Sequence, residues 1–324
     1  MPRRSAIPIL FLLAVGHACA LRRPAPPPPA KQQIIRGVQR EVRGLGVGRT
    51  GNFERAGRRE AYFRCYFTGK LELPDSYVGL RVKEGSAAGC GLDEDRYDVF
   101  FYRIEAVSGD DAPVTQALEE AGEERLAFVV AHEDLHEDRA LRRLPARVNE
   151  AAATLLGFLA AARYALRDRG EKSELYRNLA REPELYLEKA RLVNRHHARL
   201  KALYRRYFNG LAGRAETLAA KARLFAEMRQ ACRAAPEAAS FNKCLAAENN
   251  AGLAFEVTYT RWYPLVYEIH RALGGDLEAT IGALRRAGEG ARGEAETVRA
   301  IEELLRSRPP GGGVTGGSAK REKE

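Results

Sequence analysis

The chain has 324 residues, of which 45% are hydrophobic and 30% are charged. Its apolar fraction is large enough for a folded core, which excludes a fully disordered protein. Its five cysteines are too few for a dense disulfide scaffold. The net charge is +10, from 53 Lys and Arg against 43 Asp and Glu. Because these charges are dispersed along the chain, they permit anionic partners without requiring one, and we do not expect a nucleic-acid-binding protein.

The first twenty residues have the pattern of a secretory signal peptide. Met1–Arg4 is basic, Ala6–Gly16 is an apolar run too short to span a bilayer, and Ala18-Cys19-Ala20 matches a cleavage site after Ala20. Two alternatives stay open: a lipoprotein signal with Cys19 as the lipidated residue, and an uncleaved anchor. We therefore expect an exported protein, located in the periplasm or cell envelope, or secreted.

The remaining chain divides by composition into a linker, one domain and a tail. Residues 21–30 are proline-rich and predict an extended, semi-rigid linker. Residues 308–324 are rich in glycine and charge and predict a disordered tail. Between them, we expect residues 31–307 to form a single folded domain without a transmembrane helix.

Four cysteines remain after cleavage at Ala20, namely Cys65, Cys90, Cys232 and Cys244. An even number of cysteines in an oxidising compartment predicts two disulfides. Three pairings are open, and closure of the shorter loops favours Cys65–Cys90 and Cys232–Cys244. Four buried free thiols are the alternative, whereas a zinc knuckle is not expected because the chain has no C-x-x-C.

The predicted elements change from mixed to helical along the chain. Residues 32–45 suit a short helix, and residues 60–67 and 97–107 are aromatic-rich segments typical of strands. From Val114 onward Ala, Leu, Arg and Glu dominate, which favours helices. The sequence thus predicts a predominantly α protein of the α+β class, with a small N-terminal sheet and a large helical C-terminal part.

One short motif carries a specific chemical signal. Residues 132–136 read HEDLH and follow the apolar run Leu126–Ala131, which predicts a buried helix. His132 and His136 lie four residues apart and share one helix face, where two imidazoles can take two corners of a tetrahedral zinc site. Glu133 lies beside them, as in the H-E-x-x-H motif of zinc peptidases, and can act as the general base. The alternative is a solvated helix with two ordinary histidines, which is favoured by the nearby acidic residues Asp134, Glu137 and Asp138.

A catalytic zinc site needs a third protein ligand, and Glu150 is the candidate. We expect the first helix to break near Leu141–Pro145, because a proline disfavours helix at the preceding residue, and a second helix to follow. The thirteen residues between His136 and Glu150 allow the chain to turn back. Ala151–Ala153 are small enough for the two helices to pack closely. Alternatively, Glu150 is an acidic residue at the start of a helix, where it favours the helix dipole.

Together with its context, the motif resembles a known family. HEDLHE followed by VNEAAATLLG is similar to H-E-L-A-H-Q and F-N-E-x-x-A in the putative aminopeptidase family of bacterial envelope proteins, which are gluzincin-like zinc metallopeptidases. Residues 248–259 and 273–277 match that family's N-N-A-x-L, T-Y and G-G-D-L motifs in the same order. Asp134-Leu135 departs from the family's Leu-Ala, and the N-terminal third matches poorly. The resemblance implies a zincin-like core with one Zn²⁺ per chain, Glu133 as general base, and the ligands His132, His136 and Glu150.

The second matching stretch adds candidates for the substrate site. Tyr259 is the candidate hydrogen-bond donor to the oxyanion, and Asn249 and Asn250 are candidates for binding the substrate backbone or orienting a ligand. The alternatives are a core tyrosine and a helix cap. His270 is a second candidate for the oxyanion donor.

Two further histidines, His196 and His197, lie in a basic segment with the leucine spacing of a helix core face. We expect them to be surface or partly buried residues of that helix, which could contact anionic lipid or peptidoglycan. A nucleotide site is not expected, because Gly44–Gly48 lacks the context of a strand followed by a helix.

Together these patterns predict an exported zinc metallopeptidase, an aminopeptidase that acts on peptides and associates with the envelope or a membrane surface. The alternative is a non-catalytic envelope protein that uses a zincin-like fold for binding or structure.

Overall fold

The computed structural model describes residues 29–55, 62–106, 112–235 and 248–307. The predicted signal peptide and tail lie outside these residues, and the extent of the predicted domain stays a prediction. The first elements are α1 (Pro29–Gly44), β1 (Phe63–Gly69), β2 (Arg81–Glu84), β3 (Tyr97–Arg103) and the 3₁₀ turn η1 (Tyr77–Gly79). They are followed by α2 (Gln116–Glu120), α3 (Glu123–His136), the 3₁₀ turn η2 (Leu141–Arg143), α4 (Ala146–Arg169) and α5 (Glu174–Phe208). The last are α6 (Arg214–Arg233), α7 (Asn250–Thr260), α8 (Tyr263–Ala272), α9 (Leu277–Gly288) and α10 (Glu294–Arg306).

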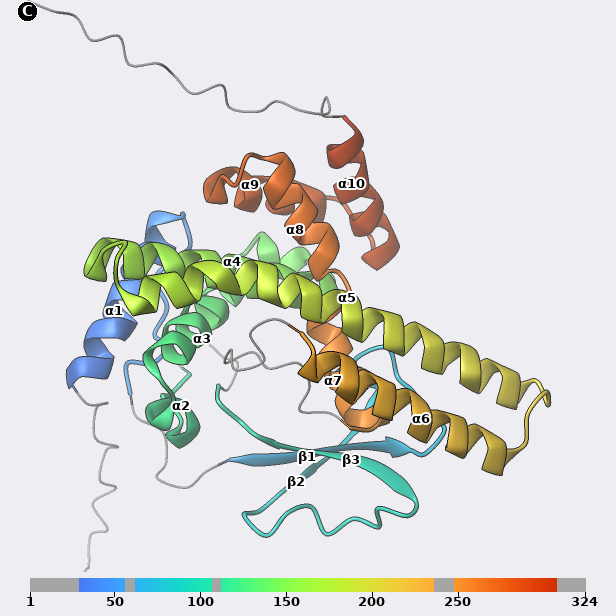
Figure 1. The fold of residues 1–324 in the computed structure, drawn as a ribbon. Helices are drawn as coiled ribbons and strands as arrows, with labels where there is room; N and C mark the ends of the chain where they lie inside the picture. The colour runs from blue at the N-terminus through green and yellow to red at the C-terminus, as the bar shows by residue number, and fades with distance from the viewer. Residues whose placement is uncertain (1–28, 56–61, 107–111, 236–247, 308–324) are drawn as a thin grey trace, which may run out of the picture.

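The α+β class and the helical predominance are confirmed (Figure 1). The predicted helix over 32–45 is α1, which begins at Pro29, so the last two residues of the predicted linker are helical instead of extended. Proline is tolerated at a helix start because its missing N–H would have no partner there. In the described part of the chain, no helix is long and apolar enough to cross a membrane.

The small sheet is antiparallel, with β1 in the centre and strand order β2-β1-β3. Both predicted strands are confirmed, although β1 begins at Phe63 and β3 ends at Arg103. The sequence did not reveal β2, because all four of its residues are exposed and it has no apolar alternation.

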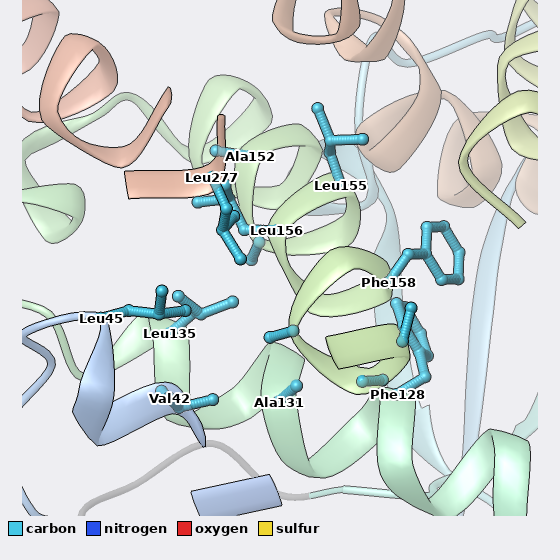
Figure 2. Close-up of a cluster of buried hydrophobic side chains, with 14 of the residues drawn as sticks. Val42, Leu45, Phe128, Ala131, Leu135, Ala152, Leu155, Leu156, Phe158 and Leu277 are labelled. Atoms are coloured by element: carbon cyan, nitrogen blue, oxygen red, sulfur yellow. The ribbon is translucent and has the colours of Figure 1, made fainter. Parts of the chain in front are cut away.

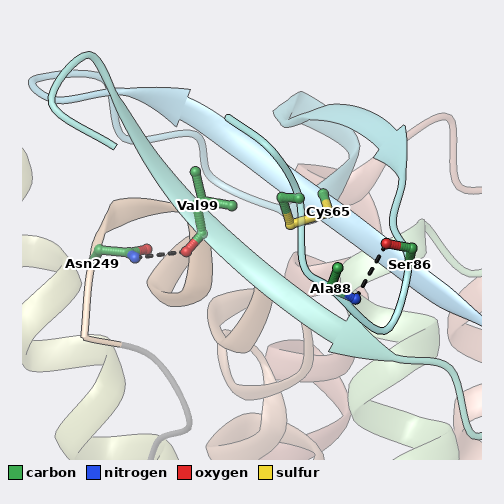
Figure 3. The surroundings of a disulfide bond; sticks show 6 residues. Cys65, Ser86, Ala88, Val99 and Asn249 are labelled. Atoms are coloured by element: carbon green, nitrogen blue, oxygen red, sulfur yellow. Dashed lines mark hydrogen bonds between the residues drawn. A yellow bond between two sulfur atoms is a disulfide. The ribbon is translucent and has the colours of Figure 1, made fainter. Parts of the chain in front are cut away.

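A disulfide joins β1 to the loop that follows β2 (Figure 3). It pairs Cys65 with Cys90, as the loop-closure argument predicts. Cys232 is also disulfide-bonded. Because Cys244 lies outside the described residues, its pairing with Cys232 stays a prediction.

The helical core is built around α3, which packs against α1 on one side and α4 on the other. Figure 2 shows Val42 of α1 and Leu45, which directly follows α1, near Leu135 of α3, and Phe128 of α3 beside Phe158 of α4. All residues of the apolar run Leu126–Ala131 are buried, as predicted. A helix enclosed on both sides holds its polar side chains in fixed directions, which is what a site for a small ligand requires.

The chain breaks between α3 and α4 as predicted, but α3 already ends at His136, before the predicted break at Leu141–Pro145. Leu144 has an extended backbone before Pro145, and α4 begins at Ala146. At Gly157 of α4, an added Cβ would lie 3.4 Å from the backbone of His132. The small residues Ala151–Ala153 are buried beside it. The two helices are therefore close enough for side chains from both to meet.

Candidate metal centre

A cleft of about 930 Å³ opens between the helical core and the sheet. Residues of α3, α4 and α5 line one side of it. The other side is lined by residues of β1, η1, β3 and α7. In Figure 1, α7 lies between the helical core and the sheet, and it contacts both. The cleft thus collects side chains that are far apart in the sequence.

Three predicted ligands meet in this cleft. The Nε2 atoms of His132 and His136 lie 3.0 Å apart, and each lies 3.3 Å from Oε2 of Glu150. Among the described residues, these three form a group whose ligand atoms all lie within 4.8 Å of one another. We name these residues the ligand triangle.

The spacing of the ligand triangle fits a tetrahedral zinc ion. With bonds of about 2.0–2.1 Å to imidazole nitrogen and carboxylate oxygen, a tetrahedral ion places its ligand atoms about 3.3 Å apart. Oε2 of Glu150 is buried and, among the described residues, receives no well-directed hydrogen bond in spite of its closeness to both rings. One cation among the three atoms would interact favourably with all of them, which is the arrangement expected of a metal centre.

Asn149 sets the orientation of the second histidine. Its Nδ2 donates to the carbonyl oxygen of Leu141 at 2.7 Å, so its Oδ1 is directed to Nδ1 of His136 at 2.6 Å. Because Oδ1 only accepts hydrogen bonds, Nδ1 of His136 carries the proton and Nε2 presents its lone pair when the ring is neutral. Partners of this kind orient metal-ligating histidines. The sequence analysis did not assign a role to Asn149, although the N-E pair of the resemblance contains it.

Within the ligand triangle, His136 and Glu150 shift each other's pKa strongly. Burial alone would lower the pKa of His136, but Glu150 and Glu133 raise it to about 9. Burial alone would raise the pKa of Glu150, but the two imidazoles 3.3 Å from its Oε2, His132 and His136, bring it well below its usual range. Glu150 is therefore a carboxylate at neutral pH, the form that binds a cation.

Next to the ligand triangle lie a carboxylate and two phenols. Glu133 is half-buried and lines the cleft. Tyr77 lies with its hydroxyl 3.4 Å from Oε1 of Glu150, and burial with the charge of Glu150 raises its pKa to about 12. The ring of Tyr259 lies 6.3 Å from that of His132, and burial with Glu150 raises its pKa well above the usual value. Both tyrosines therefore keep their protons at neutral pH and can donate hydrogen bonds.

Tyr77 was missed by the sequence analysis. It lies in a three-residue 3₁₀ turn far from the motifs in sequence, and no pattern around it marks a site. Its backbone N–H donates to Thr258 of α7 at 2.8 Å, and this tertiary contact helps to bring it to the cleft.

The two asparagines of the second matching stretch have structural roles instead of the predicted contact with substrate. Asn249 caps α7 by accepting from the N–H of Gly252, and it donates to the carbonyl oxygen of Val99 (Figure 3). Asn250 is fully buried and donates to the carbonyl oxygens of Lys70 and Glu72. Neither lines the cleft. Their side-chain groups join α7 to the sheet region, so they position the helix that carries Tyr259.

The remaining histidine predictions are corrected. His196 and His197 are buried rather than on the surface, because α6 and α7 cover α5. Burial lowers the pKa of His197 to about 4. His270 lies near the end of α8 as predicted, but it does not line the cleft, and its Nδ1 lies 3.0 Å from Oγ1 of Thr280. His270 is therefore not placed to act as an oxyanion donor.

The structure does not support the alternative of a solvated helix with two ordinary histidines, because two of the three acidic residues around the motif are buried. Asp134 and Asp138 are both buried. Asp134 accepts hydrogen bonds from Thr50 and Asn52 on the side of α3 away from the cleft. Asp138 accepts from the backbone at the start of η2 and from Arg285. These acids hold loops and helices in place, and their presence does not indicate an exposed helix.

A comparison with known families finds a match over most of the described chain. The family described as "Putative aminopeptidase" matches residues 82–298, which is more than half of the chain and contains the whole ligand triangle. The chain belongs to this family. The match extends well beyond the two motif regions on which the resemblance rested. No curated protein and no solved structure matches the chain significantly.

Proposed function

We propose that the protein is an exported zinc metallopeptidase, an aminopeptidase with one Zn²⁺ per chain and a zincin-like core. One observation carries the proposal: the spacing of the ligand triangle, beside Glu133 in a cleft of about 930 Å³. Membership of a family described as aminopeptidases supports the same reaction class.

Each residue of the site has a separate role in the proposed hydrolysis of a peptide bond. His132, His136 and Glu150 would hold the zinc, which when bound supplies Lewis-acid polarisation of the scissile carbonyl and lowers the pKa of water. Glu133 accepts the proton of the attacking water and delivers it to the leaving amine. Tyr259, with Tyr77 beside it, donates hydrogen bonds toward the developing oxyanion. Asn149 holds His136 in the productive tautomer.

Export is part of the proposal. It rests on the pattern of residues 1–20. The disulfide Cys65–Cys90 supports it, because structural disulfides persist mainly in oxidising compartments. Peptides are then the proposed substrates, at or near the cell envelope.

The test measures metal and hydrolysis in the same preparations. We expect the mature protein to contain about one zinc by elemental analysis and to hydrolyse aminoacyl or peptide substrates. Glu133→Gln should keep the zinc and lose about 10²–10⁴-fold in kcat. Full hydrolysis in Glu133→Gln with zinc bound would exclude this mechanism. Bound zinc without turnover on any peptide would favour the non-catalytic envelope protein, and no zinc after reconstitution would exclude the site.

A further inference from the structure

The side of the cleft facing the ligand triangle is formed by aromatic rings. We name it the aromatic wall, and it consists of Tyr66, Tyr77, Phe100, Tyr102, Phe255 and Tyr259. These residues come from β1, η1, β3 and α7, so the sheet and α7 together build the surface.

Phe255 lies at the centre of the aromatic wall. Its ring centroid is 4.9 Å from that of Phe100, 5.1 Å from Tyr102 and 5.2 Å from Tyr66. All three pairs are tilted, within the range of geometries that aromatic pairs prefer over a face-to-face sandwich. Phe255 is itself only partly buried, so part of its ring remains exposed.

The aromatic wall is continuous with the metal centre. The ring centroid of Phe255 lies 5.6 Å from that of Tyr259 and 5.9 Å from that of Tyr77. Tyr259 in turn lies beside His132, and Tyr77 beside Glu150. A peptide whose carbonyl lies at the ligand triangle would therefore place a neighbouring side chain on the aromatic wall.

Four of the charged side chains that line the cleft form two ion pairs. Arg125 forms an ion pair with Glu105. Lys189 lies 2.9 Å from Glu256, and both are largely buried. Because these four charges neutralise one another in pairs, they supply little net attraction for a charged side chain. The aromatic wall can then discriminate among substrates by apolar contact.

We propose that the aromatic wall selects peptides with a large apolar side chain, aromatic above all, at a residue beside the scissile bond. This inference rests on the proposed peptidase function. Covering a phenylalanine ring with apolar surface is worth far more than covering a methyl group, and we expect about a tenfold or greater preference for Phe over Ala.

The first experiment locates the cleaved bond and the preference together. Zinc-loaded mature protein is incubated with alanine-based heptapeptides that carry one Phe, Leu or Glu at each position in turn. Mass spectrometry of the products identifies the bond and gives kcat/KM for each peptide. We expect Phe beside the cleaved bond to be preferred over Ala by about tenfold, with Leu between them. Equal rates, or a preference for Glu, would overturn the inference while leaving the peptidase proposal standing.

Variants then test whether Phe255 is responsible for the preference for Phe over Ala beside the cleaved bond. Phe255→Ala should lose most of the preference for Phe, lowering kcat/KM about tenfold for the Phe peptide and much less for the Ala peptide. Phe255→Leu keeps an apolar side chain if the alanine variant does not fold, and it should lose part of the preference. Phe101→Ala is the matched control, since Phe101 is 41% exposed on β3 and does not line the cleft. A preference unchanged in both Phe255 variants would overturn the assignment.

A binding measurement separates this inference from the proposed function. If no peptide is hydrolysed, the same peptides are titrated against the zinc-loaded parent and Phe255→Leu by calorimetry. Binding of the Phe peptide about tenfold tighter than the Ala peptide, reduced in Phe255→Leu, would support the aromatic wall although the chemistry had failed. Equal binding of both peptides would exclude it.

Discussion

The two faces of helix α3 present a direct comparison of buried polar groups. On the cleft face, His132 and His136 direct their Nε2 atoms toward each other and toward Oε2 of Glu150. On the back face, Asp134 accepts hydrogen bonds from Thr50 at 2.7 Å and Asn52 at 3.2 Å. The carboxyl of Asp134 is thus satisfied by donors of the fold, whereas Oε2 of Glu150 is buried and, among the described residues, has no hydrogen-bond partner. A buried carboxyl with its donors in place stabilises the fold, whereas a buried oxygen without one beside two imidazoles is what a metal centre is expected to show.

Removing one of the three ligands of the ligand triangle should have the largest effect, on both zinc content and hydrolysis. We expect His136→Ala to lose its zinc, and with it all hydrolysis, because two remaining ligands hold the ion poorly. Asp134→Asn is the matched control on the back face of the same helix, and it should keep about one zinc per chain. Elemental analysis of both purified variants makes the comparison, and zinc retained in His136→Ala would place the metal elsewhere.

On the back face, the buried carboxyl of Asp134 should make the free energy of unfolding depend on pH. Burial raises the pKa of Asp134 to about 6 from an ordinary value of 3.8, although the hydrogen bonds from Thr50 and Asn52 lower it. Between these values the folded chain binds more protons than the unfolded chain, so the free energy of unfolding falls as pH rises from about 4 to about 6. The contribution of this one carboxyl is about 3 kcal/mol.

Asp134→Asn should abolish that contribution. Urea unfolding of metal-free parent and variant at pH 4 and pH 7 gives the difference directly, and the other titrating groups cancel in it. The parent should lose about 3 kcal/mol more than the variant over this interval. Identical pH profiles would show that Asp134 keeps an ordinary pKa.

On the cleft face, removing the hydrogen-bond partner of His136 should lower the affinity for zinc without abolishing zinc binding. In Asn149→Ala the ring of His136 loses the acceptor for its Nδ1, and zinc affinity should fall about 10–100-fold. Asn149→Asp keeps an acceptor oxygen there and should recover most of the affinity. Competition with a chelator measures both dissociation constants. Unchanged affinity in Asn149→Ala would show that packing alone orients the ring.

Removing the hydroxyl of Thr50, a hydrogen-bond donor to Asp134 on the back face, should have the smallest effect of these substitutions. Thr50→Val has nearly the same shape and removes one hydrogen bond to a buried carboxyl, which should lower the free energy of unfolding by about 1–2 kcal/mol. Zinc affinity should stay at the parent value. A loss of zinc as large as in Asn149→Ala would mean that the two faces of α3 are coupled.

Local sequence patterns predicted much of the metal centre. The four-residue spacing of His132 and His136 places both on one face of a helix whatever surrounds that helix. Pro145 predicts a break before the second helix, so the return of the chain toward Glu150 was also a local expectation, although α3 ends earlier, at His136. The strands β1 and β3 were found by their aromatic residues, whereas the exposed strand β2 left no signal.

The sequence by itself therefore determined the helix that carries the histidines, the turn after it and the residues able to bind a metal. The tertiary structure alone decided which other residues reach the site. It brought Tyr77 to Glu150 from a short turn, directed Asn249 and Asn250 away from the cleft, and buried Asp134 among donors. The physical reason is range: helix periodicity acts within a few residues, whereas the partners of a buried polar group are set by packing between distant segments.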